Sequence, residues 1–113
     1  MNLNERKRRY DMKMWTVEIS AKVPDYLIRN EAEVEFRNND LMRILPQVNG
    51  VTQAISSWAH ANPAKVALKF DTTAPDIREA IQRGINIFGE TLYRSGFGTE
   101  FEIFGIEVIE LGE

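Results

Sequence analysis

Residues 15–23 read WTVEISAKV, a stretch in which every odd-numbered side chain is apolar and every even-numbered one is polar. A β-strand points successive side chains to opposite faces of its sheet. This alternation therefore predicts a strand with one face in the core and the other toward water. Pro24 and Asp25 follow directly and predict the end of the strand.

Three later segments of the chain also have strand patterns. Residues 51–60 mix β-branched and aromatic side chains with serine and threonine, and residues 66–70 alternate apolar with polar side chains. The sequence HANP at 60–63 is typical of a turn, so these two segments predict a hairpin. Residues 100–111 alternate until Gly105, beyond which the apolar positions shift by one, and this predicts a β-bulge at the glycine.

The strongest helix pattern covers residues 75–94, where apolar side chains recur at spacings of three and four. Such a stripe predicts a helix with one face on the sheet. Thr73 and Asp76 resemble a capping box, with Thr73 as the N-cap and Asp76 reaching back to it. Gly84 and Gly89 each weaken a helix by up to about 1 kcal/mol, and we expect their role to be close packing against the sheet.

Residues 26–50 predict another helix, less clearly. The side chains Asn-Asn-Asp at 38–40 can cap a helix, and the apolar residues that follow them share one helical face. Pro46 argues against a long regular helix, and Asn-Gly at 49–50 predicts its end. Residues 32–36 fit either an earlier turn of this helix or a short extra strand, and of the two we favour the helix.

The order of these elements is strand, helix, strand, strand, helix, strand, which is that of the ferredoxin-like βαββαβ unit. It predicts an α+β domain with a four-stranded antiparallel sheet and two helices on one face. The chain has 113 residues, a usual size for one domain. We assign residues 12–113 to this single domain and residues 1–11 to a flexible basic tail.

The composition limits both the chemistry and the expected location of the chain. It contains no cysteine, which excludes disulfides, thiolate metal ligands and thiol catalysis. No apolar run approaches the roughly 20 residues of a membrane helix, and no apolar stretch follows the charged start as it does in a secretory signal. We therefore expect a cytoplasmic protein that does not associate with membranes.

Few residues are candidates for catalysis or for binding a cofactor. His60 is the only histidine, has no evident partner in the sequence, and is expected to be a solvated turn residue. Glu100 and Glu102 stand two apart on a predicted strand, whereas a hard cation needs several oxygens that converge from a shaped loop. The glycines of SGFG at 95–98 close a helix rather than open one, so they do not predict a phosphate loop. We expect no enzymatic activity, no metal and no cofactor.

Two aromatic side chains are left over from the predicted core. Trp58 and Phe104 are expected on the sheet face away from the helices, where they form an apolar patch with Met14. Exposed apolar patches often mark interfaces, and tryptophan is favoured at their energetic centres. The patch predicts a protein partner of unknown identity, or a second copy in a homodimer. The alternative is that Trp58 is an ordinary core residue.

The outward positions of the two central strands bear on RNA binding. A sheet of this topology binds single-stranded RNA by stacking bases on aromatic side chains of those strands. Here the outward positions hold no aromatic residue, and Glu18 would repel phosphate. These positions, which argue against RNA recognition, are Thr16, Glu18, Ser20, Ala67, Lys69 and Asp71.

A basic cluster near the start of the chain suggests an alternative function. Arg6, Lys7, Arg8 and Arg9 are four adjacent cations, and such groups bind phosphates with a steep salt dependence. They predict a nucleic-acid-associated protein. The other interpretation is a charged tail that keeps the chain in solution.

Several segments together resemble a known kind of small protein. The opening WTVEI at 15–19, the strand at 66–70, the cap and IREAI at 73–81 and the closing IEVI at 106–109 resemble small ferredoxin-like proteins of unknown function from actinobacteria and their phages. Residues 26–36 depart from that pattern. The resemblance implies the fold and a phage or bacterial origin, and it carries over no functional residues. The leading hypothesis is a non-enzymatic accessory or regulatory protein that acts through protein–protein contact.

Overall fold

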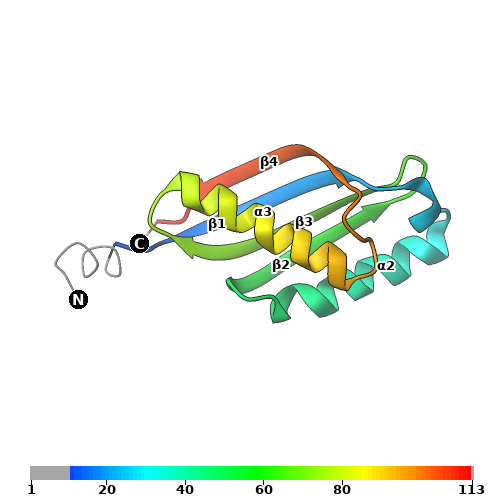
Figure 1. Ribbon diagram of the computed structural model, residues 1–113. Helices are drawn as coiled ribbons and strands as arrows, with labels where there is room; N and C mark the ends of the chain where they lie inside the picture. The colour runs from blue at the N-terminus through cyan, green and yellow to red at the C-terminus, as the bar shows by residue number, and fades with distance from the viewer. Residues whose placement is uncertain (1–10, 113) are drawn as a thin grey trace.

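The computed structural model describes residues 11–112 of the chain and has an α+β fold with one four-stranded sheet (Figure 1). All neighbouring strands are antiparallel, in the order β2-β3-β1-β4. Helices α2 and α3 lie on the same face of the sheet, which confirms the predicted ferredoxin-like arrangement. The elements are β1 (Lys13–Lys22), η1 (Asp25–Leu27), α2 (Glu31–Ile44), η2 (Leu45–Gln47), β2 (Val51–His60), β3 (Lys65–Ala74), α3 (Ile77–Arg94) and β4 (Glu102–Glu110).

The inward side chains of β1 form the middle of the core. Val17 pairs with Phe70 of β3 and Ile19 pairs with Leu68, and all four side chains are fully buried. The alternation predicted for residues 15–23 is therefore confirmed, because the inward face of β1 lies under α3 while its outward face carries the polar side chains.

The β-bulge predicted near Gly105 is confirmed. Ser20 of β1 pairs with Gly105 of β4, but the next residue, Ala21, pairs with Ile103. Phe104 is thus the extra residue, and the strand passes it without a partner on β1. A bulge re-aims the side chain it contains, which matters for the surface described below.

The helix favoured for residues 32–36 is confirmed, and the alternative of an extra strand is wrong. α2 starts earlier than predicted, because the N-cap is Asn30, whose side chain accepts a hydrogen bond from the Glu33 backbone N–H. Residues 38–40 lie inside α2, so their predicted capping role is wrong. The α-helix ends at Ile44, and Pro46 stands in the tighter turn of η2, as its effect on a regular helix predicts.

The start of α3 also differs from the prediction. Thr73 is not the N-cap, because it belongs to β3 and pairs with Met14 of β1. Asp76 is the N-cap, and its carboxylate accepts a hydrogen bond from the Glu79 backbone N–H at 2.9 Å. Pairing with the first residues of β1 extends β3 to Ala74 and moves the N-cap three residues along the chain, from Thr73 to Asp76.

Asp76→Ala is expected to lower the free energy of unfolding by about 1 kcal/mol, because it leaves a helix N–H without its acceptor. Chemical denaturation measures this change. Thr73→Val serves as the control, since it keeps the β-branched shape on a half-buried strand position and is expected to stay within about 0.5 kcal/mol of the unchanged chain. The reverse ranking of the two variants would restore Thr73 as the cap.

Candidate protein-interaction surface

The sheet face opposite α2 and α3 is the candidate functional surface, and we call it the open face. No helix or strand within residues 11–112 packs against it. Paired residues of neighbouring strands point to the same side, so the outward side chains form rows across the sheet, with register shifts after Ser20 of β1 and at two places in β2. They are Met14, Thr16, Glu18, Ser20 and Lys22 of β1, Gln53, Ser56, Trp58 and His60 of β2, Lys65, Ala67, Lys69, Asp71 and Thr73 of β3, and Glu102, Phe104, Gly105, Glu107 and Ile109 of β4.

One row of the open face has small side chains between two aromatic residues. Trp58 pairs with Ala67, Ala67 with Ser20, and Ser20 with Gly105, next to the bulged Phe104. Small residues lie next to the aromatic ones: Ala67 and Ser20 on the two central strands, and Gly105 on the edge strand β4 beside Phe104. With strands about 4.8 Å apart, the two aromatic residues are attached about 14 Å from each other. We call this row the trough, with Ala67, Ser20 and Gly105 as its floor and Trp58 and Phe104 as its walls.

Both walls are exposed, and each contacts a neighbour on the same face. Trp58 is 47% exposed, and its ring stacks on His60 with centroids 5.6 Å apart and an interplanar angle of 3°. Phe104 is 52% exposed, and the Lys65 ammonium lies 5.5 Å from its ring centroid. The predicted exposure of both aromatic residues is confirmed, and the interpretation of Trp58 as a core residue is wrong. His60 is the last residue of β2 rather than a turn residue.

Met14 does not join the walls, so the predicted three-residue patch is not one patch. It pairs with Thr73, six residues along β1 from Ser20. At about 3.3 Å per residue, that places it about 20 Å from the trough. Its sulfur instead accepts a hydrogen bond from the Thr52 hydroxyl, 3.2 Å away.

Charged side chains of both signs stand beside the trough. In the next row toward Met14, Lys69 lies opposite Glu18, which lies opposite Glu107. Within residues 11–112, none of the ion pairs joins charged side chains of the open face. In the following row the Asp71 carboxylate accepts a hydrogen bond of 2.6 Å from the Thr16 hydroxyl. The open face therefore presents separate positive and negative groups rather than a field of one sign.

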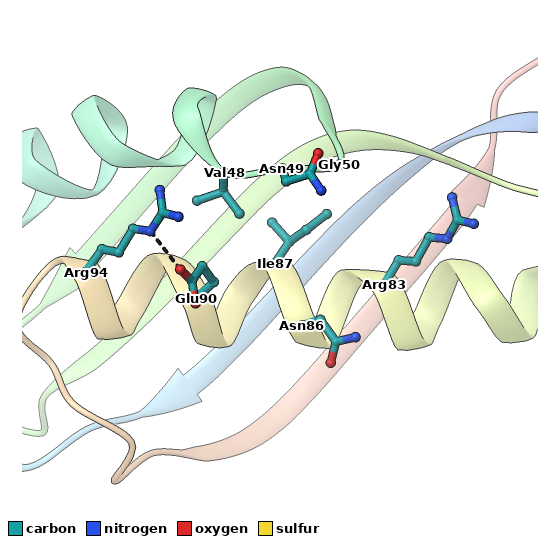
Figure 2. Close-up of a pocket in the computed structure, with 8 residues that line it drawn as sticks. All are labelled: Val48, Asn49, Gly50, Arg83, Asn86, Ile87, Glu90 and Arg94. Carbon is teal, nitrogen blue, oxygen red and sulfur yellow. Dashed lines mark hydrogen bonds and ion pairs between the residues drawn. The ribbon is translucent and has the colours of Figure 1, made fainter.

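A groove of about 550 Å³ lies on the other side of the molecule, between α3 and the turn before β2 (Figure 2). Arg83 and Arg94 stand at its two ends, but each has a partner in the chain. Arg94 Nε donates to the Glu90 carboxylate at 2.7 Å, and Arg83 Nη1 donates to the Thr73 carbonyl at 2.6 Å. Sequence reasoning missed this groove because its two sides are about 40 residues apart in the chain. The lining residues are Val48, Asn49, Gly50, Arg83, Asn86, Ile87, Glu90 and Arg94.

The sequence also suggested two carboxylates, a glycine-containing segment and a basic cluster as candidate sites. Glu100 and Glu102 are exposed near the start of β4, and within the part of the chain that the structure describes no three His, Asp or Glu side chains gather as a metal site. Residues 95–98 close α3 and lead toward β4, with Gly96 and Gly98 at positive φ angles of 83° and 73°. The basic cluster of Arg6, Lys7, Arg8 and Arg9 lies outside the described residues. Its role in nucleic-acid binding stays a prediction.

The structure defines a ferredoxin-like α+β domain whose sheet leaves one partly aromatic face open. The chain matches no model of a known protein family and no curated protein. The resemblance to small ferredoxin-like proteins of actinobacteria and their phages therefore stays a prediction. None of the helices in residues 11–112 has the length and apolar character needed to cross a membrane.

Proposed function

We propose that this chain is a non-enzymatic accessory protein of the cytoplasm that binds another protein through the open face of its sheet. The observation that carries the proposal is the trough, because two large aromatic walls stand in water on either side of a floor of small residues. Exposed apolar side chains that gather on one face often mark binding surfaces, and tryptophan side chains buried in an interface often dominate the affinity.

A protein fits the open face better than a nucleic acid does. Both central strands lack an outward aromatic side chain, so bases have no platform there on which to stack. Glu18, Glu107 and Glu102 interrupt the positive charge of the lysines and disfavour phosphate. A surface of mixed charge around aromatic rings has the anatomy of a protein interface.

Site-specific crosslinking tests the proposal. We expect a photoreactive phenylalanine analogue in place of Trp58 to crosslink to protein in the cytosol of the native source. The same analogue in place of Tyr93, which is 64% exposed on α3, is the control and is expected to give little product. Equal crosslinking from both positions, or none from position 58, would exclude the open face as the binding surface.

A further inference from the structure

The rows of the open face are arranged so that the face is complementary to itself. A twofold axis that runs along the strands, midway between β1 and β3, places the open faces of two copies against each other. This operation exchanges the two edge strands, so β2 of one copy faces β4 of the other. It likewise exchanges β3 with β1 and keeps each row opposite the same row.

The aromatic walls then meet across the axis. Trp58 of one copy faces Phe104 of the second, and the same contact occurs twice because the interface is symmetric. Sheets packed face to face lie about 10 Å apart, which is too close for four large rings over a floor of bulky side chains. The small floor residues Ala67, Ser20 and Gly105 leave the space that the rings fill.

The charges beside the trough also match across the axis. Lys69 of one copy faces Glu18 of the other, and His60 faces Glu102. Lys69 and Glu18 are on the two central strands, nearest the axis. The rotation of about 30° that is usual between packed sheets therefore displaces them least. One row opposes like charges, Lys65 and Lys22, but it lies at the end of the sheet, and Lys65 there contacts the ring of Phe104.

The area of the open face is sufficient for a dimer. Four strands about 4.8 Å apart, with about 3.3 Å of rise for each residue, give a face of roughly 600 Å² for strands of this length. Two such faces bury roughly 1,200 Å², the lower limit of specific and stable interfaces. A partner that covers only the trough buries much less.

We propose that the protein bound by the open face is a second copy of this chain, packed face to face about this twofold axis. The inference rests on the proposed function, since it names the partner of the same surface. Trp58 and Phe104 form the centre of the interface, and the two Lys69–Glu18 contacts select the register.

The size of the full-length chain in solution is the first test. Sedimentation equilibrium is expected to show a dimer at micromolar concentration, and Trp58→Ala is expected to raise the dissociation constant at least about 30-fold, as at an interface hot spot. Phe36→Ala is the matched control, because Phe36 is an aromatic residue of α2 with 62% exposure on the other side of the molecule. It is expected to leave the dissociation constant unchanged.

A charge exchange tests the arrangement itself. The Lys69→Glu chain presents two acidic side chains near the axis, and the Glu18→Lys chain presents two basic ones. Each variant alone is expected to be monomeric, because the twofold axis opposes like charges. An equimolar mixture is expected to form a heterodimer in which both contacts join opposite charges. Circular dichroism of each variant confirms that it is folded.

The outcomes separate the two proposals. Variants that each dimerise like the unchanged chain, or a mixture that stays monomeric, would overturn the face-to-face arrangement. A monomer at several hundred micromolar whose position 58 crosslinks a different protein would overturn the second copy and leave the proposed function standing. A monomer without any such crosslink would remove both proposals.

Discussion

Gly84→Val is expected to lower the free energy of unfolding by about 3 kcal/mol, the upper end of the usual cost of overpacking a core. Gly84 lies on the face of α3 that packs on β1, and a Cβ atom there would stand 2.8 Å from Cγ1 of Val17. Real Cβ contacts are not that short, so α3 or β1 has to move, and valine adds two more carbon atoms to the collision. Urea denaturation followed by circular dichroism measures the loss.

Alanine substitutions at two glycines of the same helix give the control. Gly84→Ala retains the collision with Val17 and is expected to destabilise the domain. Gly89→Ala adds a Cβ at an ordinary 3.7 Å from the Phe101 ring, so it is expected to stabilise by up to about 1 kcal/mol through helix propensity. If both variants shifted stability in the same direction, the close approach at Gly84 would not be the reason for that glycine.

The close packing predicted for Gly84 is confirmed, whereas Gly89 has room for a Cβ atom and its predicted close packing is wrong. Alternation over residues 15–23 and the apolar stripe of α3 each depend on one buried face, and local pattern is enough to recognise such a face. The parity slip at Gly105 likewise has a local cause, so the bulge was predictable before its partner strand was known.

The caps were predicted wrongly for a physical reason. Several side chains near each helix start have the chemistry of an N-cap, and local sequence does not say how far the preceding strand continues. Pairing of Thr73 with Met14 decides that question for α3, and that pairing joins residues 59 positions apart. In α2 the N-cap is Asn30, eight residues before the predicted cap, so the polar side chains at 38–40 lie inside the helix.

The candidate surface was also predicted only in part. Alternation placed Phe104 opposite Phe101 and Ile103, and it left Trp58 open between the outer face and the core. The common row of the two aromatic residues depends on pairing across four strands. Met14 has the same outward parity and yet lies at the other end of the sheet. Parity assigns a face, whereas only the register assigns a place on it.

Arg37 is the contact that no pattern in the sequence indicated. From α2 its guanidinium donates to the Leu27 carbonyl and to the Ser95 carbonyl, each at 3.1 Å. Its Cζ also lies 4.8 Å from the ring centroid of Phe97. One side chain thus joins the segment before α2 to the C-terminal end of α3, where a positive charge also complements the helix dipole.

Arg37→Met is expected to lower the free energy of unfolding by about 3 kcal/mol, because two charge-assisted hydrogen bonds are lost while the apolar stem is kept. Arg37→Lys is expected to recover less than half of this loss, since one ammonium cannot reach both carbonyls in the fork geometry of a guanidinium. Both changes are read from denaturation midpoints at constant slope.

Arg29→Met is the matched control, because Arg29 also lies near the start of α2 but only pairs with Glu33 at the surface. Surface ion pairs contribute about 0.5 kcal/mol, so this variant is expected to stay close to the unchanged chain. Amide hydrogen exchange localises the effect: only Arg37→Met is expected to speed exchange at Ser95 and Phe97, whose backbone N–H groups close the end of α3. Equal stability of the two methionine variants would show that the bridge from α2 to α3 does not stabilise the fold.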